Sequence, residues 1–257
     1  MSTALVTGAS SGIGREFADL LAADGTDLVL LARSEERLRE LGERLQREYG
    51  VTVTVVVKDL ADPDAPRETA AALDARDIVV DVLVNNAGFG THGPFVESDP
   101  DAELDEIQVN VTAVTELTRR FLPGMVERGD GAVVNVASTA AFQPGPLMAV
   151  YYATKAYVLH FSEALTEELA GTGVTVTALC PGPTETNFDT RAGIGDTTLF
   201  ERGVMDARTV ARAGYRGMKR GDAVVVPGLR NRLTTLLVRL VPRSTARRVA
   251  MRLQDTR

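Results

Sequence analysis

Residues 3–14 read TALVTGASSGIG, an apolar run that leads into a turn with three glycines. The run predicts a buried strand, and the residues from about Arg15 onward have the spacing of a helix. Glycines at such a junction let the backbone turn tightly, approach a phosphate closely and pack the helix on the strand. Because N–H groups at a helix start favour negative charge, the turn predicts a pyrophosphate site, although glycines also occur in turns that only connect two elements.

Six further apolar runs rich in Val, Leu and Thr predict additional strands, and segments with helical spacing separate them. The predicted strands after Thr3–Thr7 are Asp27–Leu31, Val51–Val57, Val82–Asn85, Ala132–Val136, Val174–Leu179 and Ala223–Val226. Strands that are apolar throughout need cover on both faces, and the intervening helices supply it. The pattern predicts an α/β protein with a single-domain Rossmann fold, in which helices flank a doubly wound, mostly parallel seven-stranded sheet.

The composition is that of a globular protein without a metal site. The length of 257 residues suits one large α/β domain, and 44% hydrophobic with 25% charged residues is ordinary for such a domain. The single cysteine, Cys180, excludes an internal disulfide, and His92 and His160 have no metal-binding spacing. The first residues lack the blocks of a secretory signal, and no run approaches the ~20 apolar residues of a membrane span, so we expect a cytoplasmic protein.

Charge is distributed unevenly along the chain. Residues 228–257 contain eight arginines and one acid, a balance of +7, and because the whole chain carries −7, residues 1–227 carry −14. This contrast predicts a basic helical extension over 228–257 after a domain formed by 1–227. The apolar residues of the extension share one helical face, flanked by Arg232, Arg239 and Arg243, and they are Leu229, Leu233, Leu236, Leu237, Leu240 and Val241.

Three partners suit this amphipathic extension. It can pack on the acidic body, pack on a second subunit, or rest weakly on an anionic membrane surface. We favour packing on protein, because a stripe of leucines is more often core than anchor. The negative charge of the body argues against a nucleic-acid partner.

The residues that end the second predicted strand bear on the choice of dinucleotide. They read LLARS over 30–34, and about 20 residues after such a glycine turn an acid usually binds the ribose hydroxyls of NAD. Arg33 would instead attract a 2′-phosphate, and the Ser34 hydroxyl would add a donor. The sequence therefore favours NADP(H) over NAD(H), unless Arg33 is only a solvated charge before the helix predicted over 35–49.

A serine, a tyrosine and a lysine follow the fifth predicted strand. Tyr151 and Lys155 are four residues apart, so they share one face of a helix, whereas Tyr152 points about 100° away and is expected to pack or to face a neighbouring subunit. A phenol is a poor base at neutral pH, and the Lys155 cation is expected to favour its ionised form. Tyr151 is thus a candidate for proton transfer to or from an oxygen that Ser138 also hydrogen-bonds.

The spacing over Thr7–Gly14 resembles that of the short-chain dehydrogenase/reductase family, whose signature is Thr-Gly-x3-Gly-Ile-Gly, and the resemblance extends over most of residues 3–186. It implies a Rossmann fold, a nicotinamide cofactor and hydride transfer between NADP(H) and a carbonyl or alcohol substrate. By the same resemblance the catalytic residues are Asn110, Ser138, Tyr151 and Lys155.

The resemblance also implies the cofactor-binding residues. Asp59-Leu60 would contact the adenine edge, Asn85-Asn86-Ala87-Gly88 would lie beside the cofactor, and the segment 180–186 would close over it, while Asn86 would also tie adjacent strand ends together. The full set is Gly8, Ser10, Ser11, Gly12, Ile13, Gly14, Arg33, Ser34, Asp59, Leu60, Asn86, Ala87, Gly88, Tyr151, Lys155, Pro181, Gly182, Thr184 and Thr186.

Residues 187–205 lack periodicity and resemble the substrate lid of this family. Apolar residues of this segment, with Phe142, Leu147 and Met148, predict a lipophilic substrate such as a ketone, a ketoacyl compound or a steroid-like compound; those of the segment are Phe188, Ile194, Leu199, Phe200 and Met205. The resemblance implies a homodimer or homotetramer through helices around 101–129 and 150–171. Two alternatives are a non-catalytic NADP(H)-sensing protein and a membrane-peripheral scaffolding protein on the same fold.

Overall fold

The computed structural model describes residues 2–186 and 204–254, except for the side chains of Arg239 and Leu253. The lid predicted over 187–205 therefore lies outside the described residues, apart from its last two positions.

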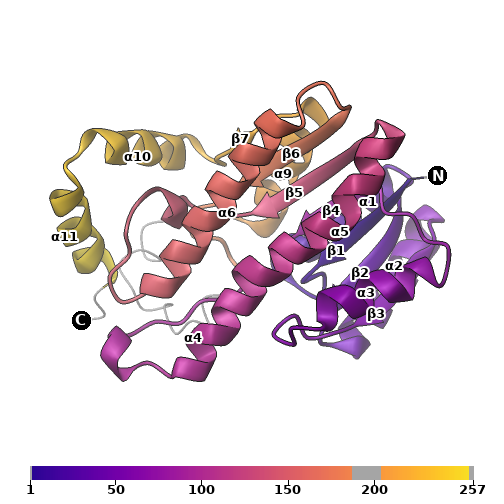
Figure 1. Ribbon diagram of the computed structural model, residues 1–257, viewed down its shortest axis with the longest axis horizontal. Coiled ribbons are helices and arrows are strands. Elements are labelled where there is room, and N and C mark those ends of the chain that lie inside the picture. Colours follow the sequence, from indigo (N-terminus) through magenta and orange to yellow (C-terminus); the bar gives the residue numbers. More distant parts are fainter. Residues whose placement is uncertain (1, 187–203, 255–257) are drawn as a thin grey trace.

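Seven strands form one sheet in the order β3-β2-β1-β4-β5-β6-β7 (Figure 1). Their bounds are β1 Thr3–Thr7, β2 Asp27–Ala32, β3 Val53–Val57, β4 Val82–Asn85, β5 Gly131–Val136, β6 Val174–Leu179 and β7 Val224–Val225. Every neighbouring pair is parallel, so the predicted α/β fold with a doubly wound sheet is confirmed. The strand order reverses between β1 and β4, and a ligand cleft in such sheets opens at this point beyond the carboxyl ends of the strands.

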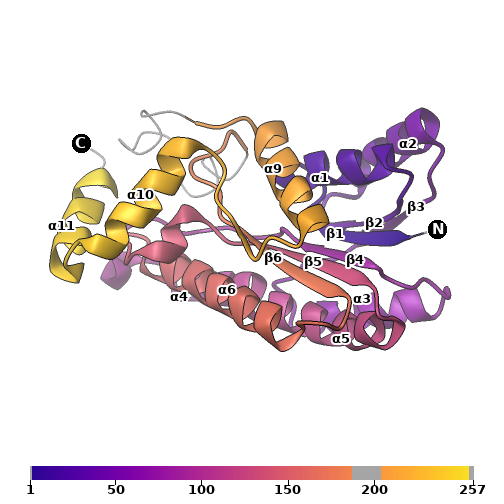
Figure 2. The same cartoon turned by 90° about the horizontal axis from the view of Figure 1, so that it is seen from above.

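Helices cover both faces of the sheet (Figure 2). One face carries α1 Gly12–Ala23, α2 Glu35–Tyr49 and α9 Ala207–Arg220, and the other carries α3 Ala65–Asp74, α4 Pro100–Ile107, α5 Ala113–Arg128 and α6 Ala149–Glu168. Residues alternate between the two resulting cores, as the pleat of a strand requires: Val6 packs with α1 and α9, whereas Leu5 packs with α3 and α5. Helix cover on both faces explains why the strands are apolar throughout.

A buried polar network crosses the second core beneath the carboxyl ends of the central strands. The Asn85 amide donates to Asn135 Oδ1 at 2.9 Å and to Thr118 Oγ1 at 3.1 Å, and the Asn135 amide donates to Ser162 Oγ at 3.0 Å. These hydrogen bonds join β4 and β5 to α5 and α6. Because an unpaired polar group is costly in a core, the network fixes how the two helices sit on the strands.

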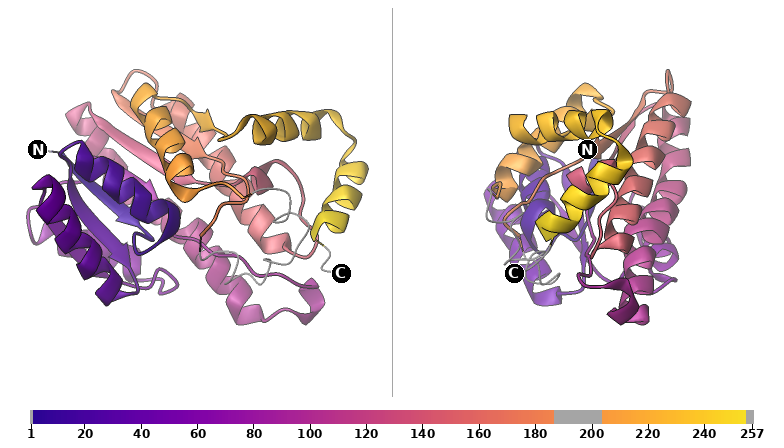
Figure 3. Two further views of the ribbon diagram at one scale, coloured as in Figure 1. Left: turned by 180° about the vertical axis from the view of Figure 1, so that it is seen from behind. Right: turned by 90° about the vertical axis from the view of Figure 1, so that its left-hand side faces the viewer.

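After β7 the chain forms two further helices, α10 Leu229–Leu240 and α11 Arg243–Gln254, with Pro242 at the break between them. They lie at the end of the molecule opposite the amino terminus (Figure 3). The packing expected for the leucine stripe on the protein's own body is wrong, because Leu229, Leu233, Leu236, Leu237 and Leu240 are 51–84% exposed. The side chains that these helices bury are small or polar, and they are Thr235, Ala246, Ala250 and Gln254.

Within the described ranges, none of the helices combines the length and the apolar character that a membrane crossing requires.

Candidate active site

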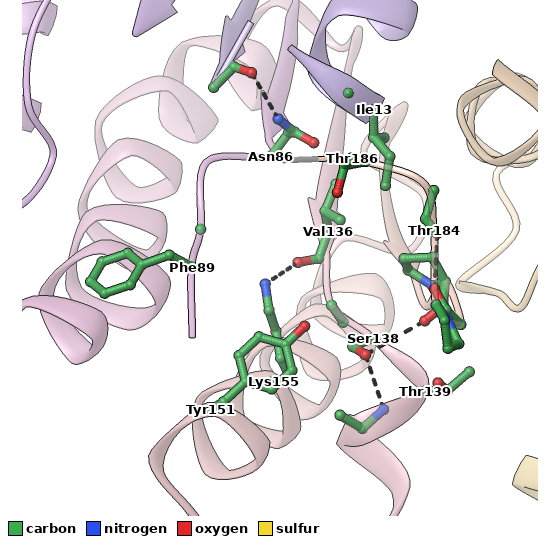
Figure 4. Close-up of a pocket in the computed structure, with 18 of the residues that line it drawn as sticks. Ile13, Asn86, Phe89, Val136, Ser138, Thr139, Tyr151, Lys155, Thr184 and Thr186 are labelled. Carbon is green, nitrogen blue, oxygen red and sulfur yellow. Dashed lines mark hydrogen bonds between the residues drawn. The ribbon is translucent and has the colours of Figure 1, made fainter. Parts of the chain in front are cut away.

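A cavity of about 890 Å³ opens at the carboxyl ends of the strands. Its walls are the glycine turn after β1, the segments that follow β2 to β6, the start of α6, and the inner faces of α10 and α11. Figure 4 shows Ser138, Tyr151 and Lys155 on one side of it, with Ile13, Thr184 and Thr186 across from them.

The glycine turn has backbone angles and contacts that only glycine accommodates. Gly8 and Gly12 have φ of +65° and +53°, in the left-handed region that other residues avoid. Gly12 lines the cavity, whereas Gly14 does not: a Cβ on Gly14 would lie 2.5 Å from the Gly8 carbonyl oxygen, so this glycine packs the helix on the turn. Ser10, Ser11 and Ile13 line the cavity beside them.

Asn86 ties the turn to the end of β4. Its Nδ2 donates to the Thr7 carbonyl at 2.9 Å and to the Gly8 carbonyl at 3.3 Å. In return, Thr7 Oγ1 accepts from the backbone N–H groups of Asn86 and Ala87. The expected tie between adjacent strand ends is therefore present, and it holds the turn open toward the cavity.

Basic residues gather at the end of the cavity beyond β2 and β3. Arg33 and Ser34 line it, and Arg33 Nη1 lies 3.4 Å from Asp59 Oδ2 with both side chains about half exposed. Two basic residues that the sequence analysis missed, Arg37 and Lys58, line the same end. Lys58 was detectable in principle, because Ala32 pairs with Val57 in the parallel register and the next residues on both strands are basic.

Ser138 and Tyr151 meet at the wall formed by β5 and α6. Ser138 Oγ accepts a hydrogen bond from the Ala140 N–H at 3.0 Å, which fixes the hydroxyl at the strand end (Figure 4). Removal of water from around the Tyr151 hydroxyl raises the pKa of this phenol, and a hydrogen bond with Ser138 only partly opposes the rise. The phenol therefore carries its proton near pH 7.

Lys155 is almost fully buried, and its Nζ donates to the Val136 carbonyl at 2.8 Å. Burial lowers the pKa of Lys155 to about 8, against an opposing attraction from Glu106. The ammonium lies 5.7 Å from the centroid of the Tyr151 ring. Burial is the largest influence on the Tyr151 phenol and raises its pKa, so a shift toward the ionised form, which the Lys155 cation was expected to favour, is not seen in this structure.

Asn110 lies in a π-helical stretch, Gln108–Thr112, between α4 and α5. Its Nδ2 donates to the Phe89 carbonyl at 2.8 Å and to Thr154 Oγ1 at 3.1 Å, and its Oδ1 accepts from the Phe89 N–H at 3.2 Å. The side chain thus holds the segment after β4 against α6. A π-bulge widens the backbone locally and is frequent at functional sites.

Gly88 approaches Asn110 and Lys155 closely, so that a side chain at this position would be crowded. A Cβ on Gly88 would lie 3.0 Å from Asn110 Oδ1 and 3.3 Å from Lys155 Nζ. Gly88 and Ala87 both line the cavity, so small residues at these positions keep the space beside the Lys155 ammonium open.

Glu106 is a buried acid near the site that the sequence analysis missed. It is 0% exposed, and its Oε2 accepts from the Thr91 N–H at 2.9 Å and from Thr91 Oγ1 at 3.0 Å. Burial raises the pKa of Glu106 to about 7. Glu106 stands four positions before Asn110, a spacing that places two residues on one helix face. Because the helix around it is rich in acids, the sequence alone predicts that Glu106 is a solvated surface charge.

The segment after β6 borders the cavity through Pro181, Gly182, Thr184 and Thr186. It is held to the chain after the undescribed residues, since the Glu185 N–H donates to the Met205 carbonyl at 2.8 Å and the Met205 N–H donates to the Pro183 carbonyl at 2.9 Å. Burial raises the pKa of Cys180 to about 12, which leaves this thiol unreactive at neutral pH. Asp59 and Leu60, at the far end, also line the cavity.

The two carboxy-terminal helices complete the wall near Tyr151. Gln254 Nε2 donates to the Tyr152 hydroxyl at 2.6 Å, and the Gln254 carbonyl lies 3.0 Å from His92 Nε2. Tyr152, expected to pack or to face another subunit, is 6% exposed and lines the cavity. Phe142 and Met148 line it too, whereas Leu147 is not among the described lining residues. Several residues of the extension join them, and these are Leu229, Asn231, Thr234, Thr235, Val238 and Val249.

Comparison with known proteins places this site in a family. A sequence model of the family described as short chain dehydrogenase matches residues 2–195. The chain is 43% identical over 185 residues to a putative ketoacyl reductase from Streptomyces coelicolor, a match that covers 71% of this chain and 70% of that protein. It is 37% identical over 183 residues to the very-long-chain 3-oxoacyl-CoA reductase of Anas platyrhynchos, covering 69% of this chain and 58% of that protein.

The match thus spans less than two thirds of the length of the Anas protein. Among solved structures, a short-chain dehydrogenase from Sphingobium yanoikuyae in complex with NADPH has a TM-score of 0.83 and 38% identity, over 92% of each chain. The chain therefore belongs to the short-chain dehydrogenase family, whose members are oxidoreductases that bind NAD(P)(H) and act on carbonyl or alcohol groups.

Proposed function

We propose that the protein is an NADP(H)-dependent reductase of lipophilic carbonyl compounds, such as ketones or ketoacyl thioesters. The observation that carries the proposal is the meeting of Ser138, a neutral Tyr151 and a buried Lys155 at one wall of a large cavity. A neutral phenol beside a fixed hydroxyl is a proton donor for an oxygen that gains negative charge.

The residues of the cavity fit a nicotinamide dinucleotide. The left-handed glycines of the turn and the side-chain-free approach at Gly88 leave backbone open to a long ligand, and a Cβ on Gly12 would strike Thr186 at 2.8 Å. Backbone N–H groups at the start of α1 suit a pyrophosphate. The cavity extends from this turn to Tyr151, so one ligand can reach both ends.

The proposed role of each residue follows from its position at the cavity. A bound nicotinamide dinucleotide supplies the hydride. Tyr151 donates its phenolic proton to the substrate oxygen, and Ser138 hydrogen-bonds the same oxygen as charge develops on it. Lys155 then stabilises the phenolate through its charge, and Asn110 keeps the segment after β4 in place beside it.

The preference for NADP(H) rests on the basic end of the cavity. Arg33, Arg37 and Lys58 all line it, and a 2′-phosphate there would receive charge-assisted hydrogen bonds, with Ser34 as a further donor. Among the described residues that line this end, Asp59 is the acid, and it already pairs with Arg33. NAD(H) lacks the phosphate that these residues match.

The substrate class follows from the opposite end of the cavity. Phe142, Met148, Tyr152, Val238 and Val249 give that end a largely apolar surface, beside polar side chains of α10 such as Thr235. An apolar wall favours a ketone or acyl chain over a sugar, since a buried hydroxyl without a partner is costly. The relatives named as ketoacyl and 3-oxoacyl-CoA reductases support this substrate class. The assembly of the chain into a homodimer or homotetramer stays a prediction.

A substrate panel tests the proposal. The full chain is incubated with NADPH and, separately, with aliphatic ketones, 3-ketoacyl thioesters, steroid ketones and ketoses, and the nicotinamide absorbance is followed. We expect turnover of the apolar carbonyls, and slower turnover with NADH. Tight NADPH binding without turnover of any carbonyl would favour the non-catalytic NADP(H) sensor instead, and preferential turnover of ketoses would overturn the substrate class.

A further inference from the structure

Helix α10 exposes its leucines and turns small polar side chains toward the protein. Leu233, Leu236, Leu237 and Leu240 are 51–81% exposed, lie outside the cavity lining and subtend roughly 100° of the outer surface, as an apolar stripe does, whereas Leu229 at the start of the helix also borders the cavity. The inner face carries Asn231, Thr234 and Thr235, which line the cavity. A surface helix of a monomer usually buries its apolar face and exposes its polar face, whereas α10 does the opposite. The described residues of the chain do not cover the outer stripe, so another surface is needed to cover it.

Arginines surround this leucine stripe. Helix α11 lies at the same end of the molecule (Figure 3) and adds the exposed Arg247, Arg248 and Arg252. By helix geometry Arg230 and Arg232 lie on the two flanks of the stripe, where Arg230 also lines the cavity and Arg232 Nε donates to the Val226 carbonyl at 2.9 Å. Residues 229–254 contain seven arginines and no acid. An apolar stripe between arginines is the pattern of helices that lie in the plane of a bilayer interface.

We propose that the leucine stripe of α10, with the arginines of α10 and α11, docks the protein on an anionic phospholipid surface. The leucines would enter the boundary between headgroups and acyl chains, and the arginines would contact phosphate groups beside them. The charge complementarity is specific to this part of the chain, because the body over 1–227 carries −14 and is repelled by the same surface. Repulsion of the body orients the docked molecule with α10 and α11 toward the lipid.

A second copy of the chain is a poorer match for the same face. A two-fold contact would place the stripe against its own copy and would bring the two sets of arginines together without an acid between them. Like charges held close in a desolvated contact destabilise it. A layer of anionic headgroups instead supplies a counter-charge around the whole stripe.

The docked orientation has a consequence for substrate access, and this point alone rests on the proposed function. The opposite face of α10 lines the cavity, so the bilayer and the cavity are separated by about one helix diameter, on the order of 10 Å. A lipophilic carbonyl compound dissolved in the bilayer would therefore be concentrated beside the cavity. Binding to lipid does not require turnover and is measured without it.

The test is flotation of the full chain with vesicles of phosphatidylcholine alone or with ~30 mol% phosphatidylglycerol. We expect binding to the anionic vesicles, a fall in bound fraction when salt shortens the Debye length to about 3 Å, and weak binding to phosphatidylcholine. The double variant Leu233→Gln and Leu237→Gln, whose side chains are outside the cavity, should lower the partition coefficient about tenfold or more. Arg247→Gln with Arg248→Gln should also lower it.

The matched control is Val96→Gln with Leu104→Gln, which removes two side chains that are 91% and 63% exposed on the acidic part of the body. It should leave vesicle binding unchanged. Absence of binding to anionic vesicles, or equal binding by the leucine double variant, would overturn the proposal. Self-association of the parent chain in sedimentation, abolished by the leucine double variant and without lipid binding, would assign the stripe to a second copy instead.

Discussion

Gln254 donates a side-chain hydrogen bond to the hydroxyl of Tyr152 at 2.6 Å, so the last described helix is fastened to the residue beside the proposed proton donor. The two side chains are 1% and 6% exposed, which shields the bond from water. The contact determines where α11 sits on the cavity wall, and His92 reinforces it through the Gln254 carbonyl.

Tyr152→Phe should therefore weaken this wall. Loss of the hydroxyl leaves the buried Gln254 amide without its acceptor, which should lower the free energy of unfolding by about 1–2 kcal/mol in urea denaturation. The variant should raise KM for a bulky ketone more than it lowers kcat, because Tyr151 keeps its position. Tyr157→Phe is the matched control, since its hydroxyl pairs with Thr115 at the exposed surface. An unchanged KM would count against a role of α11 in holding substrate.

Tyr151→Phe should abolish reduction while leaving NADPH binding largely intact. The variant keeps the ring and removes only the proton donor, so kcat should fall by about 10²–10⁴-fold. Steady-state turnover and NADPH fluorescence titration measure the two quantities separately. Retention of more than about a tenth of the parent kcat would mean that another group delivers the proton.

Arg33→Ala should weaken NADPH binding and leave NADH binding nearly unchanged. A lost charge-assisted contact with a phosphate should raise the Kd for NADPH about tenfold or more. Arg39→Ala is a suitable control, because Arg39 lies exposed on α2, shortly after Arg33 in the sequence, and pairs with Glu35 outside the cavity. An equal loss of affinity for NADPH and NADH would show that Arg33 does not bind the 2′-phosphate.

Glu106→Gln should stabilise the protein more as the pH rises. The pKa of Glu106 is raised to about 7 by burial, so the unfolded carboxyl loses its proton near pH 4.5 and the folded one only near pH 7. Between these values the unfolded state binds fewer protons, and stability therefore falls with rising pH. Gln removes this penalty, which should amount to about 1–3 kcal/mol at pH 8 and little near pH 4.5.

Urea denaturation at several pH values measures the difference between Glu106→Gln and the parent. Glu43→Gln, an exposed position on α2, is the control and should show no such trend. A difference that does not change between pH 5 and pH 8 would contradict the assignment of a buried, late-titrating carboxyl.

Most of the fold and much of the site follow from the sequence because they depend on local pattern. Strands covered on both faces are continuous apolar runs, so Val174–Leu179 was predicted with the bounds that the structure has. Parallel strands end at one edge, which brings Ser138 and Asn86 toward one cavity although they are far apart in the chain. Gly8 and Gly12 have positive φ angles, which other residues rarely adopt, so glycine at these positions already indicates the backbone conformation of the turn.

The other features of the site depend on contacts between segments that are far apart in the sequence, which no local pattern of residues predicts. Helix α10 turns Asn231, Thr235 and Val238 toward the cavity, so most of its leucines face outward against the usual preference. The burial of Glu106 depends on how α4 packs at Thr91. The low pKa of Lys155 and the high pKa of Tyr151 arise from the burial of both groups, which the spacing of the two residues does not reveal.

One part of the cavity wall comes from a different stretch of the chain than the proton-transfer residues. The glycine turn, Asn110, Ser138, Tyr151 and Lys155 all fall within the residues that the family model matches, 2–195, whereas the wall built by α10 and α11 comes from 229–254. A graft of a different carboxy-terminal helix pair would thus alter what enters the cavity and leave the proton-transfer residues untouched. We therefore expect changes in the final tenth or so of the chain to alter substrate choice without changing the proton-transfer residues.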